Sequence, residues 1–262
     1  MKTSTTSHNK KWIQILVIAL WLLLWQGAYY AVGEDLLLVS PFSALRRVIE
    51  LAVSGAFWHI VFGSVARILL GFFLGLLLGT VIAAATARSQ ALYAFFSLPM
   101  SIIKATPVAS FVILALVWIR GANLSVFIAF LMVLPLIWSN VHEGIMQIDE
   151  KLLEMATVYR LPRSAILKNI TVPSVLPYFL SAAKVGLGFS WKAGIAGEVI
   201  AIPAAAIGTQ LYNAKVYLET TDLFAWTAVI ILLSVLLEKL MIHGINTLAK
   251  RLNRLAEQEV RK

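Results

Sequence analysis

Long apolar runs separated by short polar segments make up almost the whole chain. Six runs approach or exceed the length that a helix needs to cross a hydrocarbon layer of about 30 Å. They cover residues 12–32, 60–87, 102–119, 124–141, 178–202 and 223–245. This pattern predicts an all-α membrane protein with about six transmembrane helices in one domain over residues 1–262.

The longest polar island, residues 142–173, has a pattern of its own. Apolar side chains recur at i, i+3, i+4 and i+7, at Leu152, Met155, Ala156 and Tyr159. This spacing predicts a short amphipathic helix between the fourth and fifth spans. Asp149 and Glu150 suit its N-cap and first turn, and Arg160 suits its last turn. Pro162 prevents simple continuation.

The third apolar run is irregular. Pro99, Lys104 and Pro107 interrupt the approach from residue 92 to residue 119. Broken helices at membrane depth are tolerated where the backbone lines a cavity or is covered by protein. Residues 102–119 therefore either form part of a pathway wall, or Pro99 merely ends a cytoplasmic helix. On the external side, Ser40 is predicted to cap a surface helix that begins at Pro41.

Small residues recur at helical spacing in two spans. Those in the second span are Gly63, Gly71, Gly75, Gly79 and Ala83, and those in the fifth are Gly186, Ser190, Ala193 and Gly197. Such rows let helix backbones approach closely in lipid, so they predict packing seams rather than a direct transport role. The fifth span is predicted to begin after Pro173 and Pro177 and to end at Pro203.

The composition supports a membrane protein and not a soluble one. Hydrophobic residues make up 60% of the chain and charged residues 13%, well below the quarter typical of soluble domains. The chain has no cysteine, which excludes disulfides, thiolate metal sites and cysteine nucleophiles. The net charge of +9 could suggest nucleic acid, but membrane topology explains it better.

The basic residues predict which side of the membrane each loop faces. If both termini and the 142–173 loop lie inside, the inner set holds thirteen: Lys2, Lys10, Lys11, Arg88, Lys151, Arg160, Arg163, Lys168, Lys250, Arg251, Arg254, Arg261 and Lys262. The outer set holds four: Arg46, Arg47, Arg120 and Lys215. This positive-inside bias predicts that both termini and the polar loop are cytoplasmic.

Several charged residues fall within the predicted spans, where charges usually face protein or water. Arg67 lies on the packing seam of the second span and is predicted either to form structural hydrogen bonds or to snorkel. Lys184 can reach the inner surface by snorkelling. Glu238 and Lys239 either pair locally or reach water.

The fifth span carries two further charges, Lys192 and Glu198. Trp191 and Glu198 share a helical face, whereas Lys192 is rotated by roughly a hundred degrees, so a direct Lys192–Glu198 pair is not expected. Each residue either lines a substrate pathway or forms an ion pair with another helix. Lys104 is a further pathway candidate.

The polar loop resembles the "EAA" loop of importer-type ABC permeases. Glu154-Met155-Ala156 stands for Glu-Ala-Ala, and 170–173, Ile-Thr-Val-Pro, follows at the family spacing. Arg160 replaces the family's glycine, so the turn is predicted to form around Leu161 and Pro162 instead. The remainder of the chain is similar to the nitrate, sulfonate and taurine branch.

The resemblance implies a permease subunit of a prokaryotic cytoplasmic membrane that pairs with a second copy. It also implies a separate cytoplasmic ATPase that holds ATP and magnesium, and an external solute-binding protein. The residues expected to contact the ATPase are Leu152, Glu154, Met155, Ala156, Tyr159 and Arg160. The substrate would be a small anion such as a sulfonate, nitrate or bicarbonate, or an aromatic heterocycle. The pathway candidates are Lys104, Trp191, Lys192 and Glu198.

Two other classes of protein remain open from the residues alone. One is the membrane subunit of an energy-coupling-factor-type vitamin transporter. The other is a membrane-embedded lipid-modifying enzyme, which would need clustered carboxylates, histidines or a nucleophile. The four histidines have no metal-like spacing with a second ligand, which argues against the enzyme.

Overall fold

The computed structural model describes residues 5–119, 121 and 123–260, and within them it contains helices and no β-strand. The described chain forms two compact units. One comprises Met1–His59 and Gln210–Ile231, and the other comprises Ile60–Thr209 and Leu232–Lys262. Several basic positions that predict the topology, Lys2, Arg120, Arg261 and Lys262, lie outside the described residues.

The first unit is built around α1 (Thr5–Val32), α2 (Pro41–Ala52) and the start of α11 (Thr220–Val260). The predicted cap of α2 is confirmed, because the Ser40 hydroxyl accepts a hydrogen bond from the Ser43 N–H at 3.0 Å. The Arg47 guanidinium binds both oxygens of Asp222, with Nη2 to Oδ2 at 3.0 Å. This hydrogen-bonded pairing raises the pKa of Arg47 and ties α2 to α11.

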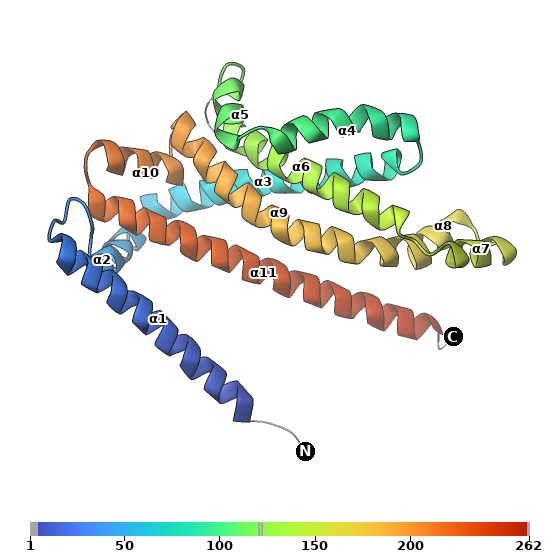
Figure 1. The fold of residues 1–262 in the computed structure, drawn as a ribbon, viewed down its shortest axis with the longest axis horizontal. Coiled ribbons are helices and arrows are strands. Elements are labelled where there is room, and N and C mark those ends of the chain that lie inside the picture. Colours follow the sequence, from blue (N-terminus) through green and yellow to red (C-terminus); the bar gives the residue numbers. More distant parts are fainter. Residues whose placement is uncertain (1–4, 120, 122, 261–262) are drawn as a thin grey trace. The chain divides into compact units, whose positions relative to one another are not determined.

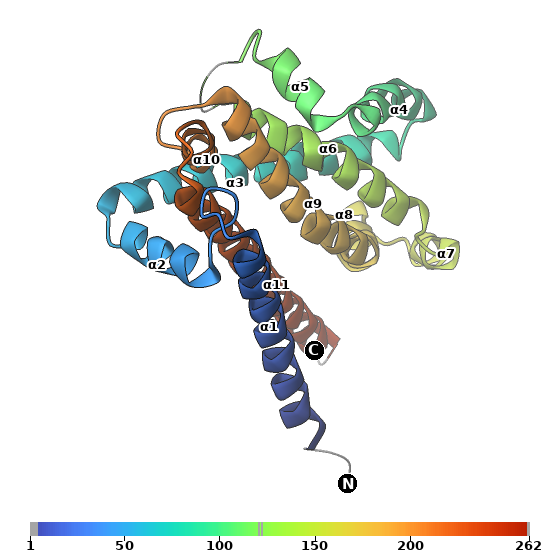
Figure 2. The ribbon, with the colours of Figure 1, turned by 60° about the vertical axis from the view of Figure 1, so that its left-hand side comes forward.

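The second unit has α6 (Asn123–Met146) and α9 (Val172–Ala201) at its centre, and the two helices run side by side (Figures 1 and 2). They share a core with α3 (Gly55–Thr86). Its buried side chains include Phe72, Val133, Ile137, Ala183 and Leu187. The predicted spans 60–87 and 124–141 thus correspond to α3 and to most of α6.

The glycine row of α3 faces α6. A Cβ on Gly75 would lie 2.7 Å from the Val133 Cβ, and one on Gly79 would lie 2.9 Å from the Ile137 Cβ. A Cβ on Gly71 would likewise collide with the α6 backbone. Real side chains do not approach so closely, so these three positions admit only glycine at the present separation of the helices.

The other small positions have looser or different surroundings. A Cβ on Gly63 would lie 3.3 Å from Nη1 of Arg67, so this glycine leaves room for a charged side chain. Cβ atoms on Gly186 and Gly197 would meet α6 side chains at 3.5 and 3.8 Å, an ordinary van der Waals separation.

The predicted irregularity of the third span, 102–119, is confirmed, but the alternative that Pro99 ends a helix is wrong. The chain instead forms α4 (Gln90–Ala105) and α5 (Val108–Ala115), which are bent by 104° to each other. Pro99 lies inside α4, and the break falls at Thr106, whose backbone is extended. The ring of Pro107 explains this position, because it disfavours helical backbone in the residue before it.

The fifth predicted span starts too late. Helix begins at α8 (Arg163–Ile166), continues through a π-helical turn, η1 (Leu167–Thr171), and leads into α9. Pro173 lies in the first turn of α9, where its missing N–H is tolerated, and Pro177 lies inside the helix. In the described residues, five helices are long and apolar enough to cross a membrane, or six if α4 and α5 together form one span.

Candidate functional site

The helix predicted in the polar island is α7 (Glu150–Val158), and both its ends are capped. The Asp149 carboxylate accepts a hydrogen bond from the Lys151 N–H at 2.9 Å, which confirms the predicted N-cap. Figures 1 and 2 show α7 and α8 at one end of the α6–α9 pair. The cap thus lies where the chain turns from one long helix into the next.

The C-terminal end of α7 differs from the prediction. Arg160 lies beyond the helix with φ +50°, in the left-handed region. The Leu161 N–H donates to the Ala156 carbonyl at 2.9 Å, and the Arg160 N–H donates to the Thr157 carbonyl at 3.0 Å. These two bonds define a Schellman motif, in which glycine is usual at the left-handed position. The turn is therefore made by Arg160 itself and not around Leu161 and Pro162.

The predicted apolar stripe of α7 divides into two parts. Ala156 is fully buried within the chain, whereas Leu152 and Met155 are about 40% exposed, at 40% and 43%, and Tyr159 is 74% exposed. Glu154 is also exposed. Ala156 therefore holds α7 against its own chain, and the other apolar side chains leave an unburied face.

The two helices that flank α7 are in close contact at this end of the molecule. A Cβ on Gly144, near the end of α6, would lie 2.9 Å from the ring of Tyr178, near the start of α9. The approach leaves no space for a larger residue at position 144. The segment 147–171 therefore connects two helices that are packed together where it leaves and rejoins them.

An enclosed ion pair joins α3 and α9. The Glu198 side chain is 0% exposed and that of Arg67 is 18% exposed. Arg67 donates to Oε1 of Glu198 from Nη2 at 2.9 Å and from Nε at 3.2 Å, and Nη2 also lies 3.2 Å from the Ala205 carbonyl. Of the two roles open to Glu198, this geometry matches the interhelical ion pair.

The second oxygen of Glu198 receives hydrogen bonds from two residues that sequence reasoning missed. The Ser64 hydroxyl donates to Oε2 at 2.8 Å, and the Gly208 N–H donates at 3.2 Å. The Ser64 Oγ in turn accepts from the Ile207 N–H at 2.9 Å. Glu198 and Ser64 thus satisfy the first amides of α10 (Ile207–Val216), which would otherwise be unpaired. The sequence offers one signal for this cluster: Ser64 is an isolated polar residue one turn before Arg67 in an apolar run.

The pathway candidates on α9 and α4 have different surroundings. Lys192 is exposed on α9, whereas its neighbour Trp191 is buried. Lys104, at the end of α4, is exposed and lies over the ring of Trp138 at 5.8 Å from its centroid. Trp191 lines a cavity between α9 and α11, whereas Glu198 is enclosed in its ion pair with Arg67.

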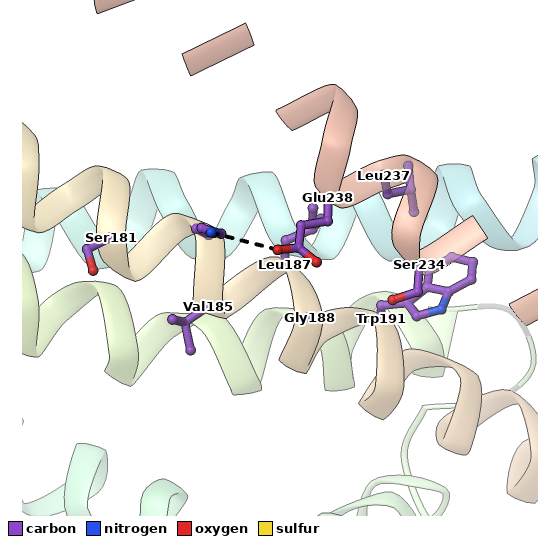
Figure 3. Close-up of a pocket in the computed structure, with 9 residues that line it drawn as sticks. Ser181, Val185, Leu187, Gly188, Trp191, Ser234, Leu237 and Glu238 are labelled. Atoms are coloured by element: carbon purple, nitrogen blue, oxygen red, sulfur yellow. Dashed lines mark ion pairs between the residues drawn. The ribbon is translucent and has the colours of Figure 1, made fainter. Parts of the chain in front are cut away.

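A cavity of about 420 Å³ lies between α9 and α11 and is shown in Figure 3. Its polar lining comes from Ser181 and Lys184 on α9 and from Ser234 and Glu238 on α11. The Lys184 Nζ and the Glu238 Oε1 are 3.8 Å apart, and both side chains are about half exposed, at 50% and 54%. Lys184 is therefore paired across helices, and not only snorkelling as the sequence suggested.

The described residues contain no group of three or more histidine and acidic side chains that could hold a metal ion. The charged groups of this part of the chain instead lie in interhelical pairs or at the surface.

Comparisons with known proteins agree with this picture. The family model described as "Binding-protein-dependent transport system inner membrane component" matches residues 71–262. The taurine transport system permease protein of Escherichia coli (strain K12) is 23% identical over 234 residues, covering 87% of this chain and 83% of the relative. The nitrate import permease protein of Synechocystis sp. is 24% identical over 209 residues, covering 76% of this chain and 75% of the relative.

The fold is also similar to a solved structure. A chain of the MetNI methionine ABC transporter, in inward-facing conformations, aligns with a TM-score of 0.60 and 16% sequence identity. The alignment covers 73% of this chain and 94% of that chain.

Proposed function

This chain belongs to the family of binding-protein-dependent transport system inner membrane components, and on that premise we propose how it works as the permease subunit of an ABC importer. Two permease copies surround a central path, and each presents α7 to one subunit of a cytoplasmic ATPase. The ATPase holds ATP and magnesium, and an external binding protein delivers the solute. Both chain termini lie on the ATPase side of the membrane.

The proposed ATPase contact rests on one observation, the exposure of apolar side chains on α7. Leu152, Met155 and Tyr159 are exposed on a short capped helix outside the apolar spans, where a soluble partner can reach them. Burial of such side chains is worth roughly 25 cal/mol per Å² of apolar area. Ala156 packs α7 against its own chain, and the close approach of Gly144 and Tyr178 joins α6 to α9 beside it. We propose that a displacement of α7 is passed to α6 and α9 through these contacts.

We propose that the transported solute carries an anionic group. Lys192 is exposed in the C-terminal half of α9, inside an apolar span, where a charge facing lipid would be costly and a charge facing an aqueous path is tolerated. The solutes named for two relatives, taurine and nitrate, each contain an anionic group. Lys104 lies at the end of α4 and is a second candidate for this path.

The ATPase contact can be tested by placing a charge on the exposed face. Leu152→Asp and Met155→Asp are expected to lower recovery of the ATPase with the tagged permease by at least about tenfold, because each puts a carboxylate into an apolar contact. Leu45→Asp is the matched control, since Leu45 is 57% exposed on α2 of the other unit. Full ATPase recovery with both α7 variants would contradict the assignment. Ala156→Asp is not a clean test, because Ala156 is buried in its own chain.

The anion assignment has a separate test. Lys192→Met is expected to lower uptake steeply while ATPase recovery stays unchanged, and Lys192→Arg is expected to retain more uptake than Lys192→Met. Wild-type uptake by the Met variant would exclude Lys192 from the path.

A further inference from the structure

The exposed surface of α2 is divided into an apolar part and a charged part. Four large apolar side chains, the α2 stripe, recur at steps of three or four residues and so share one side of the helix. They are Phe42, Leu45, Ile49 and, directly after the helix, Val53, and each is more than half exposed, from 57% to 85%. The exposed side chains of Arg46 and Glu50 pair with each other along one edge of the stripe, at 3.0 Å. A helix of this kind needs an apolar partner for one part of its surface and a polar partner for the other.

The start of α2 lies beside α1 and not beyond its end. The Trp25 Nε1–H donates a hydrogen bond to the Val39 carbonyl at 3.0 Å. Trp25 precedes Val32, the last residue of α1, by seven residues, or about 10 Å along the helix axis. Long side chains of a helix lean toward its N-terminus, so the indole does not shorten this distance. The chain has therefore turned back toward the candidate span Trp12–Val32 before α2 begins.

Two further contacts hold α2 at the ends of candidate spans. Arg47 binds Asp222, which lies in the first turn of α11, and the Trp58 Nε1–H donates to the Ala52 carbonyl at 2.9 Å. Trp58 lies in the first turn of α3, so the end of α2 is level with the start of that helix. The start, the middle and the end of α2 are thus each tied to a helix that is long and apolar enough to cross a membrane.

We propose that α2 lies in the membrane interface and that the α2 stripe is buried among phospholipid acyl chains. Arg46 and Glu50, on the edge of the stripe, reach the headgroups and water. Helices of this type place their apolar side about 5–10 Å into the boundary between headgroups and acyl chains. The contacts with α1, α3 and α11 hold α2 at the level where such a boundary begins. The proposal goes beyond the proposed transport function, because it does not depend on which solute crosses the membrane.

The composition of the stripe favours lipid over a soluble partner such as the external binding protein. A surface that binds and releases another protein is only about as apolar as the rest of the molecular surface, whereas the stripe contains no polar side chain. Nearby aromatic residues indicate the same boundary. Tyr30, in the last turn of α1, and Trp58 are both exposed, and tyrosine and tryptophan are enriched where membrane meets water.

A spin label can be attached at one chosen position, because the chain has no cysteine. Phe42→Cys and Ile49→Cys put the label on the stripe, and Glu50→Cys is the matched control, exposed on the same helix but outside the stripe. The full permease is placed in phosphatidylcholine nanodiscs. Relaxation of the label by oxygen, which concentrates among acyl chains, is compared with relaxation by a water-soluble nickel chelate. Oxygen is expected to be the stronger relaxant at positions 42 and 49, and nickel the stronger at position 50.

Three results would overturn the proposal. Stronger relaxation by nickel than by oxygen at positions 42 and 49 would show that the stripe faces water, where a soluble protein can bind it. Weak relaxation by both reagents at these positions would show that protein covers the stripe, for example a second copy of this chain. Stronger relaxation by oxygen at all three positions would show that α2 is immersed in hydrocarbon and does not lie at the interface.

Discussion

Two interhelical ion pairs of the second unit differ in almost every physical respect. The Arg67–Glu198 pair is enclosed, with the carboxylate at 0% exposure and both its oxygens hydrogen-bonded. The Lys184–Glu238 pair is about half exposed, has a separation of 3.8 Å, and borders a cavity. Both cross from α9 to a neighbouring helix.

The two pairs are expected to contribute very different amounts to the stability of the fold. A buried pair whose hydrogen bonds are satisfied is destabilised strongly when one partner is lost, because the other charge is left unpaired. An exposed pair contributes at most about 1 kcal/mol. We therefore expect mutations of the first pair to lower the free energy of unfolding far more than mutations of the second.

The largest effect is expected for Glu198→Ala. This change leaves Arg67 without its carboxylate in the membrane interior, and loss of one partner of a buried pair costs about 3–5 kcal/mol. The measurement is the unfolding midpoint of the purified permease. Glu198→Gln is the control, since it can still accept hydrogen bonds from Ser64 and Gly208 and should lose less stability. A wild-type midpoint for Glu198→Ala would show that the pair is not structural.

A smaller loss is expected for Gly208→Ala, which changes no charge. The added Cβ would lie 2.5 Å from both the Glu198 Cβ and the Val199 backbone nitrogen, so the carboxylate has to move from its partners. Overpacking of this kind costs about 1–3 kcal/mol. Gly244→Ala is the matched control, because a Cβ there meets nothing within 4 Å. Equal unfolding midpoints for the two variants would argue against a tight cluster.

Arg160 belongs to neither ion pair, and we expect it to affect stability through its backbone conformation. Its φ of +50° is unfavourable for a residue with a Cβ, so Arg160→Gly is expected to raise stability by up to about 1 kcal/mol. Arg160→Val should instead lower it, because β-branched residues tolerate this backbone least. The same unfolding assay measures both, and lower stability of the glycine variant would reveal a contact made by the guanidinium.

The smallest change in stability is expected for Lys184→Met. Loss of a half-exposed pair should shift the free energy of unfolding by less than about 1 kcal/mol. A shift as large as that of Glu198→Ala would make the two pairs equivalent and remove the distinction between them.

The long apolar runs and the α7 signals were sufficient to predict most of the helices. Asp149 and Ser40 act as N-caps as expected, because capping depends on a few neighbouring residues. Both Pro99 and Pro107 were predicted to interrupt the third run, but Pro99 lies inside α4 and the helix breaks only before Pro107. Local pattern also could not predict that Arg160 would adopt the backbone conformation usual for glycine.

The partners of the charged residues within the spans can be identified only from the tertiary structure. The sequence shows that Arg67 and Glu198 are charges within spans. They are 131 residues apart in the sequence, so no local pattern indicates that they pair. Ser64 and Gly208 are ordinary residues until the fold brings them to the same carboxylate. Lys184 and Glu238 were likewise assigned separate roles, because their helices are not neighbours in sequence.

The separation of Arg67 from Glu198 has a consequence for biosynthesis. At about 5–20 residues per second, a ribosome makes Glu198 roughly 7 to 26 s after Arg67. During that interval α3 carries a cation without its carboxylate, which costs about 2.5–3.5 kcal/mol on insertion scales. We predict that α3 is held by the insertion machinery until α9 arrives, and that Arg67→Leu releases it earlier. Crosslinking of stalled nascent chains to the machinery would measure the delay, and equal crosslinking of both chains would contradict it. Until α9 is made, α3 thus depends on the insertion machinery, and in the finished fold Glu198 takes over that role.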